Sequence, residues 1–125
     1  MEENEDKNKK VYDLEERTAK LGENIINFCK KIHLTPVNTP IINQLVGSGT
    51  SVGLNYCEAD CAESRKDFEH KLGISHKETK ESKHWLRMIS ISNPEVGTKA
   101  RILWKESNEL QLIFRSIIKK SKAHE

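Results

Sequence analysis

The chain has 125 residues, of which 32% are charged and only 6% aromatic, a composition typical of a soluble helical protein and unlike that of a β-sandwich or barrel. No apolar run approaches the ~20 residues that a membrane span requires, and the polar start MEENEDKNKK is unlike a signal peptide. We therefore expect a single cytoplasmic domain that has no membrane partner.

Charge is spread unevenly along the chain, although the net charge is only +2. Residues 1–63 carry 7 Lys/Arg against 11 Asp/Glu, a net of −4, whereas residues 64–125 carry 14 against 8, a net of +6. Such asymmetry indicates either an anionic partner or mutual attraction between helices.

Residues 1–11 are predicted to form a disordered charged tail because they lack apolar periodicity, and a four-helix bundle is expected over 12–122. The first helix, about 13–31, places its apolar or small residues four and three apart on one stripe. These residues are Leu14, Thr18, Leu21, Ile25, Phe28 and Ile32.

The second helix is expected at about 40–62, with Thr39 as its cap and Pro40 in its first position. Its stripe is Ile42, Leu45, Gly49, Val52, Tyr56 and Ala59. Propensity alone would make GSGTSVG a loop. The uninterrupted stripe instead predicts a helix whose small residues allow a neighbouring backbone to approach.

Two further helices follow. Ser64 to Asp67 resembles a capping box and predicts a helix at about 64–92. Asn93 and Pro94 predict a cap and a new start, with the last helix at about 94–120. Because short connections make consecutive helices antiparallel, the fold class is all-α, an up-down-up-down four-helix bundle.

Large apolar residues flank the stripes of the last two helices. They predict a second apolar face and a homo-oligomer, and the alternative is that they cover the edge of the core. The oligomer-interface candidates are Trp85, Met88, Trp104, Ile113 and Ile118.

Asn55 and Glu58 lie three residues apart beside the stripe, where both side chains are expected to be shielded and to need partners such as Ser51 and Thr79. The favoured interpretation is a buried polar network that sets helix register. The alternative is a small enzyme or ligand carrier that uses Glu58 as an acid or base.

Metal-type spacings are incomplete. Glu81-x2-His84 occurs once, whereas di-iron bundles need two copies. The Cys29/His33 and Cys57/Cys61 pairs are ~20 Å apart along a helical hairpin. We therefore predict no catalytic residue, metal or cofactor, and no enzymatic activity.

Two central runs, SGTSVGLNYCEADCAESRKDF and KLGISHKETKESKHWLRM, are similar to the signature of the bacterial 23S ribosomal RNA intervening-sequence protein family. YDLEERTAKLGENIINFCKKI and NELQLIFRSIIKKSK resemble that family's first and last helices, so the resemblance covers about 12–122. Gly47 stands where the family has an Arg, and Leu54 where it usually has an Ala.

The resemblance implies a left-handed bundle that forms a ring-shaped homopentamer without established enzymatic activity. Some members are encoded inside ribosomal RNA genes. A related branch serves as the accessory protein of diversity-generating retroelements, and it binds a reverse transcriptase and nucleic acid.

The leading hypothesis is a non-enzymatic, pentameric scaffold that binds RNA, DNA or a ribonucleoprotein through basic surfaces of the third and fourth helices. The alternatives are an ordinary solvated face and a protein-binding accessory module for a nucleic-acid enzyme such as a reverse transcriptase. The candidate contacts are Lys77, Lys80, Arg87, Lys99, Arg101, Lys105, Arg115, Lys119 and Lys120.

Overall fold

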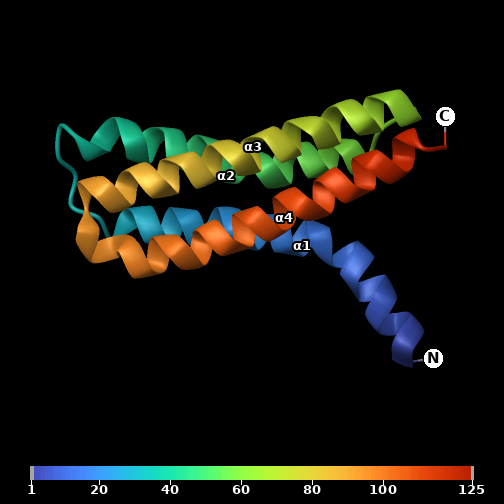
Figure 1. Cartoon of the computed structure of the whole chain (residues 1–125), viewed down its shortest axis with the longest axis horizontal. Coiled ribbons are helices and arrows are strands. Elements are labelled where there is room, and N and C mark those ends of the chain that lie inside the picture. The colour runs from blue at the N-terminus through green and yellow to red at the C-terminus, as the bar shows by residue number, and fades with distance from the viewer. Residues whose placement is uncertain (1, 125) are drawn as a thin grey trace.

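The computed structural model describes residues 2–124, and it describes side chains from Asp13 onward. Four α-helices follow in order: α1 (Glu2–Lys30), α2 (Asn38–Asp60), α3 (Arg65–Ser92) and α4 (Gly97–Lys122), with a short 3-10 helix, η1 (Pro94–Val96), before α4. Consecutive helices are antiparallel, and the α1–α2 and α3–α4 connections lie at the same end of the bundle (Figure 1). The predicted all-α four-helix bundle is confirmed.

Some helix boundaries differ from those predicted. α1 extends back to Glu2; the predicted tail of residues 1–11 lies outside the described side chains and stays a prediction. α2 begins two residues before the expected position 40 and ends at Asp60. α4 begins at Gly97 because Pro94–Val96 forms a tighter 3-10 turn.

The stripes form the core as predicted. Leu21, Leu45, Leu110 and Phe114 are almost wholly enclosed, and the Phe114 ring stacks on that of Tyr56 with the centroids 6.2 Å apart. Small hydroxyl side chains take the remaining positions where α2 meets α3. Ser82 Oγ donates to Ser48 Oγ at 3.0 Å, and Ser75 Oγ donates to the Val52 carbonyl oxygen at 3.0 Å. Because these buried hydroxyls have partners, the two helices approach closely without a desolvation penalty.

The glycines of α2 have different roles. A Cβ on Gly49 would clash with Ile25 Cδ1, and one on Gly53 would lie 3.3 Å from the backbone carbon of Thr18. These two glycines therefore allow α1 to approach α2, as predicted. Gly47 differs, because a Cβ there would meet nothing within 4 Å.

Caps were predicted with mixed success. Ser64 caps α3, since its hydroxyl accepts a 3.0 Å hydrogen bond from the Asp67 amide. The Thr39 cap is wrong: α2 already begins at Asn38, and Thr39 Oγ1 donates to the Thr35 carbonyl instead. Asn93 also makes no side-chain cap, because its side-chain oxygen accepts a hydrogen bond from Asn38.

The four sides of the bundle are packed unequally. Contacts are most extensive between α2 and α3 and least extensive between α1 and α4. The α1–α4 side is bridged by Arg17, which binds Glu106 through two nitrogens at 2.7 and 3.0 Å and reaches Glu109 at 3.3 Å. Among the helices described, none combines the length and apolar character needed to cross a bilayer.

Candidate nucleic-acid interface

The nine basic residues predicted as nucleic-acid contacts are all exposed, but the structure does not bring all of them together. Arg87 of α3 lines one groove with Arg101 and Lys105 of α4. Lys99 lines a different groove, between α1 and α4, with Lys31. Lys77, Lys119 and Lys120 lie elsewhere on α3 and α4.

The groove between α3 and α4 continues into a longer basic surface. His76, Lys80, Lys83 and Arg87 are spaced four, three and four residues apart, so they share one face of α3 over ~16 Å. Arg101, Lys105 and Arg115 belong to α4 beside them. We call these seven residues the basic seam. His76 and Lys83 were missed as candidates, although their spacing relative to Lys80 and Arg87 was visible in the sequence.

The pKa of His76 reports the electrostatics at the end of the basic seam away from the groove. Burial lowers the pKa of its imidazole below the usual 6.5, and the positive charges of Lys80, Arg115 and Lys83 lower it further. Its Nε2 atom is buried and has no hydrogen-bond partner in the described structure. The site therefore favours an incoming anion, which would offset the mutual repulsion of these cations.

Two acidic side chains of α4 are engaged by α1. Glu106 and Glu109 pair with Arg17 of α1. On α3, the pKa of Glu78 is raised, first by burial and then by the neighbouring Glu81. The acidic groups on α4 thus leave the cations of the basic seam unneutralised.

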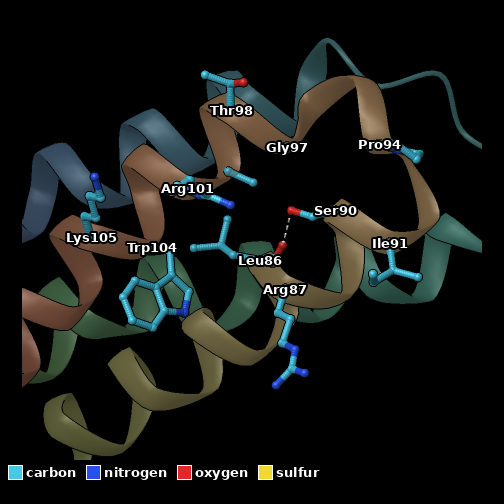
Figure 2. Close-up of a pocket in the computed structure, with 11 residues that line it drawn as sticks. Leu86, Arg87, Ser90, Ile91, Pro94, Gly97, Thr98, Arg101, Trp104 and Lys105 are labelled. Carbon is cyan, nitrogen blue, oxygen red and sulfur yellow. Dashed lines mark hydrogen bonds between the residues drawn. The ribbon is translucent and has the colours of Figure 1, made fainter.

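One end of the basic seam widens into a groove of about 800 Å³ beside the α3–α4 connection (Figure 2). The buried side chains of Leu86 and Ala100 form part of its lining. Figure 2 shows the Arg101 side chain directed into the space between α3 and α4, whereas Arg87 extends away from it. The Trp104 indole lies at the edge of the groove and is 37% exposed.

Trp104 is held by a neighbouring cation. Lys83 Nζ lies 4.9 Å from the centroid of the indole and donates a 2.9 Å hydrogen bond to Asn108 Oδ1. A cation over an aromatic face is attracted by the ring quadrupole. The contact fixes both side chains at the boundary between the groove and the rest of the basic seam.

A model of the 23S rRNA-intervening sequence protein family matches residues 10–116. The chain belongs to this family. A crystal structure of a protein of unknown function from the S23 ribosomal protein family of Bacteroides thetaiotaomicron is similar at 30% identity and a TM-score of 0.75. The match covers 85% of this chain and 98% of that one. No curated protein sequence matches.

The structure places the five oligomer-interface candidates in different surroundings, and their role in an interface stays a prediction. Trp85, Ile113 and Ile118 pack against the core, Met88 is half-buried, and Trp104 belongs to the groove. The alternative, that such residues cover the core edge, holds for the three that pack against it. The most exposed large apolar side chains are others: Ile91 at 76%, Ile102 at 64%, Leu54 at 62% and Leu112 at 54%.

The predicted buried polar network is absent in this family member. Glu58 is exposed and lies 3.5 Å from Lys71 Nζ, and Asn55 Nδ2 donates to the Ser51 carbonyl in its own helix. Thr79 is buried but donates to the His76 carbonyl. Within residues 13–124, no hydrogen bond joins two of the four side chains Asn55, Glu58, Ser51 and Thr79. The buried polar contacts across helices come from the serines of α2 and α3 instead.

The cysteines of the intervening-sequence protein are free thiols in different environments. Cys29 is buried, and burial raises the pKa of its thiol to about 11. Cys57 and Cys61 are exposed. In the part of the chain that the structure describes, no three His, Cys, Asp or Glu residues are grouped to hold a metal ion.

Proposed function

We propose that this protein is a non-enzymatic, homo-oligomeric scaffold that binds RNA through the basic seam of α3 and α4. The observation that supports it best is the environment of His76, where Lys80, Lys83 and Arg115 act on one partly buried imidazole. These three cations, which have no ion pair with any residue of 13–124, provide a favourable site for the phosphates of a nucleic-acid backbone.

The segregation of charge on α4 supports the same function. A solvated helix face would interleave acids with bases at positions three and four apart. On α4, Glu109 is four residues from Lys105, but Glu109 and Glu106 both pair with Arg17 of α1, while Arg101, Lys105 and Arg115 lie along α3. The arrangement leaves an anionic partner one continuous cationic path.

The proposal of a homo-oligomer follows the family resemblance, which implies a homopentamer. It also rests on the exposed side chains of Ile91, Ile102 and Leu112. Large apolar side chains at the surface mark contacts with other chains. Repeating the basic seam in each subunit would strengthen a modest single-site affinity through multivalency. Native mass spectrometry tests this part: we expect five subunits, and a monomer contradicts it.

RNA binding is tested by fluorescence anisotropy with a labelled single-stranded RNA over a salt series. If about four phosphates contact one seam, the affinity should fall roughly 50-fold between 50 and 200 mM salt. The double variant Arg101→Glu/Lys105→Glu should bind more weakly and with a shallower salt dependence. The double variant Lys31→Glu/Lys99→Glu reverses the same charge on the other groove, so it is the matched control. Equal losses in both variants, or no binding at low salt, contradict the proposal.

A further inference from the structure

The groove beside the α3–α4 connection contains features that phosphate contacts alone do not require. Its volume of about 800 Å³ lies within the range of small-molecule sites. It combines buried aliphatic side chains, an exposed indole and a guanidinium that points inward (Figure 2). A backbone-binding surface needs only the last of these.

We propose that this groove holds one unpaired nucleotide of a single-stranded nucleic acid, with its base against the indole of Trp104 and its phosphate on Arg101. This inference rests on the proposed function and specifies its ligand. Trp104 and Arg101 are three residues apart on α4, so their side chains emerge as neighbours on one helix face. A nucleotide presents an aromatic face and an anion at a similar separation.

The indole of Trp104 is held in one position by its neighbours. Lys83 occupies a position 4.9 Å from the ring centroid and is itself held by Asn108, but it does not line the groove. The ring is therefore fixed from outside the groove, and it lines the groove together with Leu86 and Arg101. A fixed aromatic surface loses little conformational entropy when a base binds.

The groove also contains a hydrogen-bond acceptor for a base edge. Ser90 Oγ donates its proton to the Leu86 carbonyl at 2.8 Å, so the hydroxyl oxygen keeps lone pairs that face the groove. Base edges carry N–H donors. A base that is paired and stacked within a duplex cannot enter the recess between two helices, so the site selects unpaired nucleotides.

Trp104 fluorescence provides a direct test. In a Trp85→Phe background Trp104 is the only tryptophan, because the chain has two. The probes are a short oligoadenylate, its deoxy counterpart, and the oligoadenylate annealed to oligouridylate. We expect the single strands to quench the emission and the duplex to leave it nearly unchanged. Comparing the ribo and deoxy probes shows which of the two sugars the site accepts.

Substitution separates stacking from charge. Trp104→Leu should weaken single-strand binding roughly 5- to 150-fold, the range expected for one base–aromatic stack, with an unchanged salt slope. Trp104→Phe should retain most of the affinity, and thermal melting checks that both variants fold. Arg101→Gln should reduce affinity together with the salt slope, by about 0.7 for one lost phosphate contact.

Two results overturn the inference: equal affinity of Trp104→Leu and the parent for single strands, or equal quenching by the duplex. If either occurs while the Arg101→Glu/Lys105→Glu variant still loses binding, the proposed function stands and only the stacking site is wrong. If no probe binds even at low salt, the proposed function fails, and this inference fails with it.

Discussion

The side-chain amide of Asn38 donates a 3.1 Å hydrogen bond to the side-chain oxygen of Asn93, which joins two chain connections 55 residues apart. Asn38 is fully buried, and its amide nitrogen also donates to the His33 carbonyl at 3.0 Å. Its side-chain oxygen accepts from the Thr35 amide at 2.8 Å. One buried side chain thus holds the α1–α2 connection together and ties it to the end of α3.

Removing this side chain should destabilise the protein. Asn38→Ala leaves the Thr35 amide and the His33 carbonyl without their partner, so we expect a loss of about 1–3 kcal/mol in the free energy of unfolding. Asn93→Ala removes one of these bonds and should cost about 0.5–1.5 kcal/mol. Urea denaturation measures both, and the double variant should lose less than the sum. Strict additivity would show that the Asn38–Asn93 bond contributes nothing.

Gly49 and Gly47 provide a matched pair in one helix. Gly49→Ala places a methyl group against the buried Ile25 side chain, so we expect a loss of about 1–3 kcal/mol. Gly47→Ala meets open space and should stabilise α2 by about 0.5–1 kcal/mol. Shortening the neighbour by Ile25→Val should reduce the penalty of Gly49→Ala. Thermal and urea unfolding of Gly49→Ala, Gly47→Ala, Ile25→Val and the double variant Ile25→Val/Gly49→Ala measure these changes in stability. Similar effects of the two alanine substitutions would contradict the close packing of α1 on α2.

These examples show what the sequence can predict. The four-and-three spacing predicts which residues are buried because a helix must shield one stripe, and it is confirmed for the first helix and, apart from the half-buried Tyr56, for the large residues of the second. The Ser64 cap was predictable because it depends on residues three apart. The predicted Thr39 cap is wrong because α2 already begins at Asn38 and the Thr39 hydroxyl donates to the Thr35 carbonyl. The prediction that Glu58 is shielded is wrong because a side chain beside the stripe can still point outward, here to Lys71.

The sequence predicts which types of residue form the candidate site, but it does not predict how they are arranged in space. The nine candidate cations are all at the surface, but the sequence does not show which of them the antiparallel pairing of α3 and α4 brings together. That pairing places Arg101 and Lys105 with Arg87 and separates them from Lys99. The apolar character of Trp104 predicts an oligomer face, but the sequence does not show that Lys83 and Arg101 lie beside it.

The pH dependence of nucleic-acid binding should follow His76. In the free protein its pKa is below 6.5, so it is neutral at pH 7. A bound phosphate stabilises the charged imidazolium and raises that pKa, so binding should tighten as the pH falls from about 7 to about 6. His76→Ala should bind with less pH dependence, and His33→Ala, away from the basic seam, serves as the control. NMR titration of the His76 ring protons with and without RNA measures the shift, and an unchanged pKa contradicts it.

Cys29 should make stability fall at alkaline pH. Its folded pKa of about 11 is above the ordinary 9.0 of an unfolded thiol, so the unfolded state ionises first as the pH rises. The contribution of the protonated Cys29 thiol to the free energy of unfolding is complete below pH 9 and is lost between about pH 9 and 11. Urea unfolding of the parent and Cys29→Ala across this interval should show a smaller alkaline loss in the variant. Parallel curves would indicate that the thiol is not held protonated by burial.

The unequal packing of the bundle has a consequence for how it opens. The end that carries both chain termini is closed between α3 and α4, where Arg65 donates a 2.7 Å hydrogen bond to the His124 carbonyl. α1 is held by α2 and, on its other side, mainly by the Arg17 bridge to α4. The first helix is thus the one that can detach while the other three remain assembled. Native-state amide exchange should be fastest in α1 and slowest in α2 and α3, and Glu106→Gln should accelerate it selectively in α1.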